Sequence, residues 1–469
     1  MSASRRNFLI GSAAVGAGFA GLKNCVTTAT ETKTNAEATK DGYGYGPLLA
    51  DPKGLLSLPK GFSYTVISEE GSDMNDGLKL PGAPDGMAAL PGPYGLTILI
   101  RNHELSPENT GPYGDGRELL KQIPSSKIYD AGNGKTPCSG GTSTVVFDTG
   151  KQSVVREFLS LAGTIRNCAG GMTPWKTWIS CEESVTRAGA HSNFETEKDH
   201  GYNFEVPISA RMELADPVPL IDMGRFNHEA IAVDPQTGIV YETEDRDDSA
   251  FYRFIPKQAG NLKTGGRLQV LAIADKKSAD TRNWNDRDNL QVGDKHDVKW
   301  LDVDNVTSPD DDLRYRGFDH GAARFARGEG IWYGQGGEFY FACTSGGSAK
   351  IGQIFRYRPS DAEGTDGESV SPGQLELFVE PNDGELVENA DNLTASPWGD
   401  LIVCEDRSGH VVRLVGITPQ GECYPFAMNH MNTEFAGAVF SPDGSTLFVN
   451  IQGAGLTVAI TGPWSNKTA

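Results

Sequence analysis

One pattern of apolar and polar positions recurs along the chain. A short run of alternating small and apolar residues leads into a turn with Gly or Pro. A nearly unbroken apolar run follows and ends in a polar or acidic residue. Residues 226–245, FNHEAIAVDPQTGIVYETED, are a clear copy. Alternation predicts a half-buried strand and the unbroken run a strand buried on both faces, so each copy predicts a β-hairpin.

The pattern occurs six times at irregular spacings. The copies are residues 84–104, 167–183, 226–245, 318–345, 390–406 and 433–452. Turn signals are frequent and helical periodicity is scarce, which predicts an all-β chain. Six units of about four strands each are typical of a six-bladed β-propeller. A pair of sandwiches or a β-helix is the alternative, but a sandwich seldom repeats one unit six times and a β-helix has shorter, stricter periods.

The N-terminus carries a different signal. Residues 4–9, SRRNFL, pair two arginines and precede a Gly- and Ala-rich apolar run, which is typical of a twin-arginine export signal. The run is too short and too glycine-rich for a membrane-spanning helix. We therefore predict a signal segment over 1–25, a flexible leader over 26–45 and a single propeller domain over 46–469.

This organisation predicts a periplasmic or secreted protein whose partner is the twin-arginine export machinery. No other long apolar stretch exists, so no stable membrane span is expected in the mature protein. Six cysteines follow Cys25, and in an exported protein six can pair completely. Cys404 and Cys423 are placed to close a local loop.

The net charge of the chain indicates which classes of partner it can bind. There are 62 Asp and Glu against 42 Lys and Arg, a formal net charge of -20. A nucleic-acid binder would need a basic face, so nucleic acid is not an expected partner. If the substrate is an anion, some other source of positive charge is needed.

In a propeller, equivalent residues of every copy meet around the central axis. The polar groups of the copies are Asn102-His103-Glu104, Cys181-Glu182-Glu183, Asn227-His228-Glu229, Asp319-His320, Arg327 with Glu329, Asp391-Asn392, Glu405-Asp406 and Glu434. Carboxylates crowded in one channel repel one another unless cations lie among them. The pattern therefore predicts a central metal-binding channel.

The donor types indicate which metals fit. Many carboxylate oxygens suit calcium, whereas Cys181 beside Glu182 suits a softer metal such as iron or zinc. Other interpretations remain open. Cys181 fits equally as a small buried apolar residue or as a disulfide partner of Cys168, and Glu405-Asp406 fits a solvated edge.

Arg327 lies in the glycine-flanked segment FARGEGIWYG, where the backbone can approach a ligand closely. A guanidinium group matches two phosphate oxygens at once. The alternative is that Arg327 simply pairs with a neighbouring acid.

Several segments of the chain resemble motifs of the PhoX-type alkaline phosphatases. The matching segments are RNHE at 101–104, GGTSTVVFD at 140–148, RNCAGGMTPWKTWISCEE at 166–183, GRFNHEAIAVDPQTGIVYETED at 224–245, DNLTASPWGDLIVCED at 391–406 and FSPDGSTLFVNIQ at 440–452. The resemblance implies a six-bladed propeller that hydrolyses phosphate monoesters with Fe3+ and Ca2+ near its channel.

The resemblance also implies roles for particular residues. Cys181 is similar to the family's thiolate ligand of iron, and Arg327 with Glu329 matches an Arg-Pro-Glu element that contacts phosphate and metal. With Asp391 from the channel pattern, the candidate metal ligands are Glu104, Cys181, Glu182, Glu229, Glu329, Asp391 and Glu434. Asn167 is a further candidate for substrate binding. The chain departs from the family in having Gly328 for the proline, and in lacking a histidine after Gln452.

The sequence thus predicts an exported, metal-dependent phosphatase with Arg327 and Glu329 as catalytic residues. One alternative is a calcium-dependent propeller lactonase or esterase-type hydrolase, which would need no thiolate ligand. Another is a non-catalytic, calcium-stabilised binding propeller.

Overall fold

The computed structural model describes residues 44–285, 290–407 and 412–467. Regular structure among them is almost entirely β-strand, with one α-helix, α1 (Leu313–His320). None of the described helices has the length and apolar character needed to cross a membrane. The predicted signal segment and the leader up to residue 43 lie outside the described residues.

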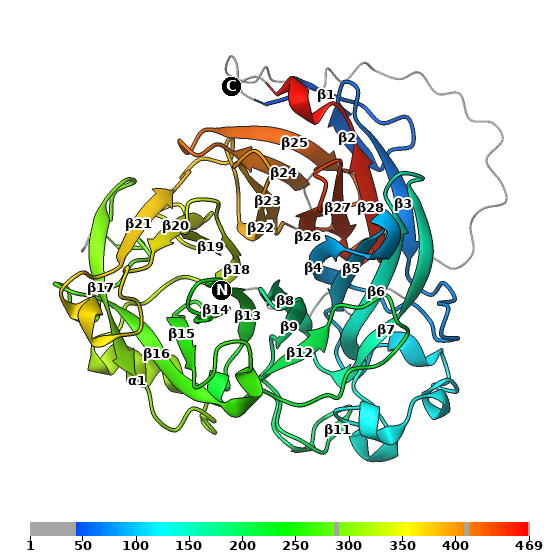
Figure 1. Cartoon of the computed structure of the whole chain (residues 1–469), viewed down its shortest axis with the longest axis horizontal. Coiled ribbons are helices and arrows are strands. Elements are labelled where there is room, and N and C mark those ends of the chain that lie inside the picture. The colour runs from blue at the N-terminus through cyan, green and yellow to red at the C-terminus, as the bar shows by residue number, and fades with distance from the viewer. Residues whose placement is uncertain (1–43, 286–289, 408–411, 468–469) are drawn as a thin grey trace. The chain divides into compact units, whose positions relative to one another are not determined.

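Five sheets stand around a common axis in an all-β, propeller-like arrangement, with one end strand of each sheet, and both end strands of the nine-stranded sheet, nearest the axis (Figure 1). The inner strands are β4 (Pro84–Pro91), β8 (Asn167–Met172), β13 (His228–Val233), β18 (Gly328–Tyr333), β22 (Ala390–Ala395) and β26 (Phe435–Phe440). Each inner strand contacts the next along the chain, and β26 contacts β4. The inner strands therefore close a ring.

The six predicted hairpins are confirmed, because each inner strand pairs antiparallel with the strand that follows it. The second strands are β5 (Thr97–His103), β9 (Thr177–Glu182), β14 (Val240–Glu244), β19 (Phe339–Cys343), β23 (Leu401–Glu405) and β27 (Thr446–Ile451). Every residue of β14, β19, β23 and β27 is buried, as expected of strands covered on both faces.

Short polar turns set the register of these hairpins. In the DPQTG turn, the Asp234 carboxylate accepts hydrogen bonds from Gln236 N at 2.9 Å and Thr237 Oγ1 at 2.7 Å. Gly238 then adopts a left-handed φ of 74° and donates its N–H to Asp234 O. A side chain that closes its own turn fixes where the chain reverses.

Outer strands complete the sheets. β6 (Gly140–Asp148) and β7 (Ser153–Thr164) continue outward from β5, and β12 (Asn203–Pro207) pairs with β9. The remaining outer strands are β15 (Phe251–Pro256), β16 (Gly266–Ile273), β17 (Lys295–Asp302), β20 (Gln353–Arg358), β21 (Gln374–Val379), β24 (Val412–Ile417), β25 (Cys423–Asn429) and β28 (Leu456–Thr461), and a separate pair is formed by β10 (Gly189–Ala190) and β11 (Glu195–Thr196). Because β17 pairs with both β16 and β21, the sheets that begin at β13 and β18 share one nine-stranded ladder.

The first strands of the described chain complete sheets formed by its last part. β3 (Ser63–Glu69) pairs with β28 from Ser63 opposite Thr461 to Glu69 opposite Leu456. β2 (Leu56–Pro59) pairs with β25, and β1 (Leu48–Leu49) pairs with β2. Hydrogen bonds between the two ends of the chain thus close the ring, which leaves no terminal sheet unpaired.

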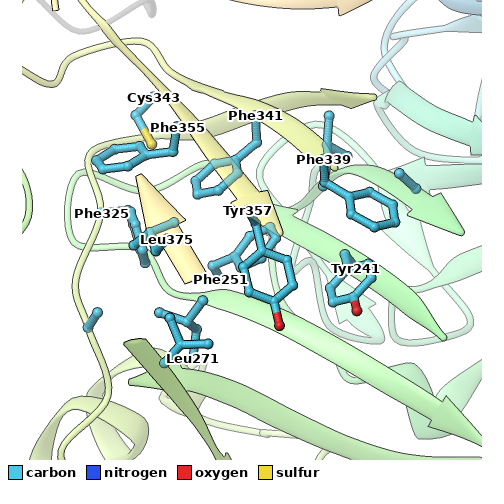
Figure 2. Packing of buried hydrophobic residues seen from close by; sticks show 14 of the residues in the cluster. Tyr241, Phe251, Leu271, Phe325, Phe339, Phe341, Cys343, Phe355, Tyr357 and Leu375 are labelled. Atoms are coloured by element: carbon cyan, nitrogen blue, oxygen red, sulfur yellow. The ribbon is translucent and has the colours of Figure 1, made fainter. Parts of the chain in front are cut away.

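Apolar clusters fill the space between neighbouring sheets. Figure 2 shows the one between the sheets that begin at β13 and β18, where Phe251 stacks on Phe341 with ring centroids 4.3 Å apart. The hydroxyls of Tyr241 and Tyr357 both donate to Glu363 Oε1, at 3.0 and 2.7 Å. The polar ends of two core aromatics therefore share one buried acceptor, which satisfies them without water.

The sequence allowed disulfides, but all six cysteines among the described residues are free. Cys404 lies on β23 and Cys423 on β25, with β24 between them. Strands are about 4.8 Å apart, so two strand positions separated by a third strand are too distant for a disulfide. Cys168 and Cys181 are on paired strands but remain unbridged.

Candidate metal centre

Five inner strands share one irregularity at their start. In β4, β8, β13, β18 and β22 the pairing with the second strand shifts after the first pair, so that two inner-strand residues face one residue of the partner. Such a β-bulge re-aims a side chain. The first residues of the five bulges are Asp85, Cys168, Glu229, Glu329 and Asp391.

The second residue of the bulge is Gly or Ala in four strands and Asn in β22. These residues are Gly86, Ala169, Ala230, Gly330 and Asn392. A Cβ atom on Gly86 would lie 2.6 Å from Ala169 Cα, and one on Gly330 would lie 2.8 Å from Asn392 Cα. Adjacent inner strands are therefore too close for larger side chains here, which crowds the five bulge donors around the axis.

The sixth inner strand contributes no side chain at this position. The bulge of β26 begins at Gly437, which has a φ of 61°. A Cβ atom on Gly437 would lie 2.2 Å from Asp85 O, so a side chain cannot be accommodated. Glu434, in the turn before β26, supplies a carboxylate from this side instead.

A second set of polar residues follows the ends of the second strands. Its members are Glu104, Glu183, Asp245, Thr344, Asp406 and Gln452. The backbone N–H of each returns to the carbonyl of a residue before the adjacent inner strand, as in Glu183 N to Arg166 O at 2.9 Å and Asp406 N to Asn389 O at 2.9 Å. These residues therefore surround the bulge donors from equivalent positions in the repeat.

The two sets bring their donor atoms together. Within each of four groups, one donor atom per residue lies within 4.8 Å of the others. The groups are Asp85–Glu104–Cys168, Cys168–Glu183–Glu229, Glu229–Glu329–Asp391 and Asp391–Asp406–Glu434. Because Cys168, Glu229 and Asp391 each belong to two groups, the donors form one continuous cluster, which we call the acidic cluster.

Burial and mutual repulsion disfavour ionisation in the acidic cluster. Burial, opposed in part by Arg166, raises the pKa of Glu183 to about 8. Burial and the charge of Asp406 raise the pKa of Asp391 to about 7. Burial and neighbouring carboxylates also hold the pKa well above its usual range for Asp85, Cys168, Glu229, Glu329 and Glu434.

The cluster contains oxygens that no described residue satisfies. Both carboxylate oxygens of Glu229 and Oδ1 of Asp85 are buried without a hydrogen-bond partner among the described residues. A buried polar group left unpaired costs about 1–3 kcal/mol. Bound cations would remove this cost, and a set of carboxylates with one thiol fits calcium together with iron or zinc. The residues present therefore fit a cluster of metal ions.

Arg327 lies at the edge of this cluster. Its Nε and Nη2 donate to the two oxygens of Asp245 at 2.7 and 3.1 Å, and Nη2 also donates to Glu329 Oε1 at 2.6 Å. Asp406 Oδ2 is 3.7 Å from Nη1. The structure thus places Arg327 beside a cluster that contains five of the seven predicted ligands, Glu104, Glu229, Glu329, Asp391 and Glu434.

Cys181 is not part of the acidic cluster. It lies on β9 opposite the β8 bulge and packs among apolar side chains that include Ile179 and Phe226. Cys168, the first residue of that bulge, is the thiol that meets Glu183 and Glu229. The prediction chose the thiol next to the paired acids, but the bulge, which reverses side-chain direction, selects the other one.

Glu182 also points away from the cluster, although its neighbour Glu183 belongs to it. Glu182 Oε1 lies 2.6 Å from His200 Nδ1, and its oxygens accept from Ile165 N at 2.9 Å and Gly201 N at 2.9 Å. His200 Nε2 in turn lies 3.3 Å from Asp130 Oδ2. Burial disfavours the imidazolium, but these two carboxylates outweigh it and hold the pKa of His200 well above its usual range.

The other paired acids divide in the same way. Glu244 binds Arg314 while Asp245 binds Arg327 at the edge of the cluster, and Glu405 binds Arg413 while Asp406 belongs to the cluster. Successive strand residues point to opposite faces, so one acid of each pair binds a cation away from the cluster and the other faces it.

Asn167 does not face the cluster. Its Nδ2 donates to Ser180 Oγ at 2.8 Å, and its Oδ1 accepts from Thr164 Oγ1 at 2.6 Å. The side chain is fully buried, with its donor and acceptor used locally. Nothing in this geometry presents Asn167 to a substrate.

Four members of the donor groups, Asp85, Cys168, Glu183 and Asp406, were not among the predicted ligands, nor was Asp245, which binds Arg327. A signal for the bulge donors was present, because an acid or thiol is the second residue of five of the six inner strands and is followed by Gly or Ala in four of them. Asp245 and Asp406 were recognised as the ends of repeat copies but not as ligands.

Comparison with known proteins is consistent with this geometry. The sequence model of the family "Alkaline phosphatase PhoX" matches residues 43–455. The chain belongs to this family. It is therefore an enzyme, an alkaline phosphatase of the PhoX type, and the resemblance noted in the sequence is confirmed. No protein in a curated set matched the chain.

A solved PhoX structure shares the fold. The structure of Pseudomonas fluorescens PhoX in complex with vanadate, a transition state analogue, is 18% identical, with a TM-score of 0.64, covering 90% of this chain and 98% of that one. A gluconolactonase from Xanthomonas campestris is 11% identical, with a TM-score of 0.38 over 89% of this chain and 98% of that one. The second likeness is too low to bear on function.

Proposed function

We propose that this PhoX-family protein is an exported, metal-dependent phosphatase that hydrolyses phosphate monoesters at the acidic cluster. The observation that carries the proposal is Glu229, whose two buried oxygens have no partner among the described residues while Cys168 and Glu329 aim donors at the same place. A buried carboxylate in this position is best explained by cations.

The donor chemistry assigns the cations to different parts of the cluster. Cys168, Glu183 and Glu229 would hold iron, because a thiolate favours a softer metal. Groups made of carboxylates alone, such as Asp391 with Asp406 and Glu434, would hold calcium. When bound, the metal ions would supply positive charge and Lewis acidity to the phosphate group.

Arg327 would bind the phosphate itself. Its fork is held by Asp245, which fixes the plane of the guanidinium group, and its remaining N–H donors lie at the partly exposed edge of the cluster. The N–H groups of Nη1 would donate to phosphate oxygens and stabilise the charge that these oxygens carry as the ester bond breaks. Glu329, which accepts from Arg327, would couple this position to the metals.

We also propose that residues 46–469 form a single six-bladed propeller, with the nine-stranded ladder counted as two blades joined at β17 and β21. The ring of inner strands and the repeated bulges support this count. Export by the twin-arginine route, and hence a periplasmic or secreted location, is supported by the sequence of residues 4–9.

The decisive test is elemental analysis of protein purified after its native export, together with hydrolysis of p-nitrophenyl phosphate before and after chelation. We expect iron and calcium in the protein, loss of activity on chelation and recovery when both metals return. Full activity in metal-free protein would overturn the mechanism. Loss of stability on chelation, with no phosphatase activity at any stage, would favour the non-catalytic binding propeller.

A further inference from the structure

We infer that Arg166 is a second phosphate-binding residue, which receives the substrate dianion together with Arg327. This inference rests on the proposed function and deepens it. It concerns the arginine before β8, to which the sequence analysis gave no role.

Arg166 and Arg327 occupy the same position in two copies of the repeat. Each lies two residues before the bulge donor of its inner strand, Cys168 or Glu329. Each has a left-handed backbone, with a φ of 48° for Arg166 and 54° for Arg327. The carbonyl of each accepts the N–H of the residue that follows the second strand, at 2.9 and 3.0 Å. The backbone therefore delivers both side chains to the cluster from equivalent places.

Arg166 contacts the cluster as Arg327 does. Its Nη2 is 2.5 Å from Glu104 Oε1 and also bonds Glu183 Oε2, and its Nε donates to Glu183 O at 3.1 Å. Each arginine thus bridges two carboxylates of the second set or of the bulges. Glu104 and Glu183 also belong to the groups of donor atoms that fit metal ions. A cation bound there would compete for the same oxygens and leave N–H donors of Arg166 for another anion.

The two guanidinium groups are the outer layer of the cluster. The side chains of Arg166 and Arg327 are 30% and 22% exposed, whereas those of Glu183 and Glu329 beneath them are 6% and 3% exposed. An anion that arrives from solvent would therefore meet the arginines before it meets the acids. In a chain with a net charge of -20, such a cationic layer is needed to admit a phosphate dianion.

Neighbouring carboxylates connect the two arginines. Asn227 Nδ2 donates to Glu183 Oε1 at 3.1 Å and to Asp245 O at 3.4 Å, so it links the acid that binds Arg166 to the acid that binds Arg327. The two guanidinium groups therefore flank one pair of acids. A phosphate monoester has three non-bridging oxygens, enough to accept from both forks.

The test uses the full, metal-loaded protein and inorganic phosphate as the probe. Arg166→Met, Arg166→Lys and Arg327→Met are compared with wild type by calorimetric titration with phosphate, by KM and kcat for p-nitrophenyl phosphate, and by metal content. The matched control is Arg316→Met, because Arg316 is 26% exposed and also bridges two carboxylates, Asp304 and Asp312, outside the cluster.

We expect Arg166→Met to weaken phosphate binding about 10- to 100-fold, as does Arg327→Met, since each loses charged hydrogen bonds. Arg166→Lys keeps the charge without the fork and should be intermediate, while Arg316→Met should bind as wild type does. An Arg166→Met protein with wild-type metal content and unchanged phosphate affinity would overturn the inference.

Two further outcomes are distinguishable. If Arg166→Met fails to fold or to load metal, Arg166→Lys decides: weakened phosphate binding at full metal content supports the inference, and unchanged binding overturns it. If wild-type protein neither binds phosphate nor hydrolyses the ester, the proposed function itself fails.

Discussion

At the scale of single residues, side-chain direction decides which chemically similar neighbours meet the metals. Cys168 and Cys181 lie on paired strands, and Glu182 and Glu183 are adjacent in sequence, yet only one of each pair reaches the acidic cluster. The residues themselves do not differ in chemistry. A bulge in one case and strand alternation in the other separate their roles.

The two thiols give the first prediction. Cys168→Ser should lose iron and lower activity strongly. Mutating a residue that only supports a metal ligand lowers metal affinity by roughly 10- to 100-fold, so removing the ligand itself should lower it at least as much. Cys181→Ser should keep its metals and activity, but should lower stability by about 1–3 kcal/mol, since its hydroxyl enters an apolar cluster. Iron content and thermal unfolding of both variants measure this. Iron loss in Cys181→Ser but not in Cys168→Ser would contradict it.

The adjacent residues Glu182 and Glu183 give the second prediction. Glu182→Gln removes one of the carboxylates that stabilise the buried His200 cation, so we expect a loss of stability of about 3–5 kcal/mol in urea unfolding. Glu183→Gln should instead weaken metal binding and leave the chelated protein at least as stable as wild type, because a buried carboxyl with a raised pKa is lost. The same defect in both variants would show that the two side chains do not act separately.

At the scale of elements, five of the six inner strands each place one donor at the axis through a bulge. The hairpins were predictable, because alternating and unbroken apolar runs with turns such as DPQTG determine them. The bulges were not, since the sequence pattern alone does not show where one strand gains a residue over its partner. This is why Glu229, Glu329 and Asp391, which lie in the cluster, were among the predicted ligands while Cys168 was not.

The close approach of inner strands gives the third prediction. In Gly330→Ala the new Cβ would lie 2.8 Å from Asn392 Cα, so β18 and β22 must separate. We expect a loss of about 1–3 kcal/mol in unfolding free energy and weaker metal retention. Gly150→Ala is the control, because its Cβ would meet only Asp148 Oδ1 at 3.5 Å. Equal stability of the two variants would argue against strand crowding at the cluster.

At the scale of the whole molecule, closure of the ring and binding of cations support one another. The pairing of β3 with β28 joins the first strands of the described chain to its last sheet, and the ring in turn holds donors from five inner strands within reach of shared ions. The repeat and the family could be predicted from the sequence because the repeat copies and the family motifs are distributed along the chain. The sequence does not predict which residues would share an ion, because that depends on closure of the complete ring.

The last prediction concerns the pH dependence of stability in chelated protein. Folding raises the pKa of Glu183 from 4.5 to about 8 and that of Asp391 from 3.8 to about 7, so the folded state binds more protons than the unfolded state between these limits. The stability that these groups contribute is present below pH 4 and is lost as pH rises through 7 to 8. We therefore expect the melting temperature in chelator to fall by several degrees from pH 5 to pH 8.

Calcium and iron should reverse the fall, because cations stabilise the ionised carboxylates of the folded state. Glu183→Gln should flatten the slope in chelator, and a melting temperature that rises with pH in the chelated wild type would contradict a cluster of buried, mutually repelling acids.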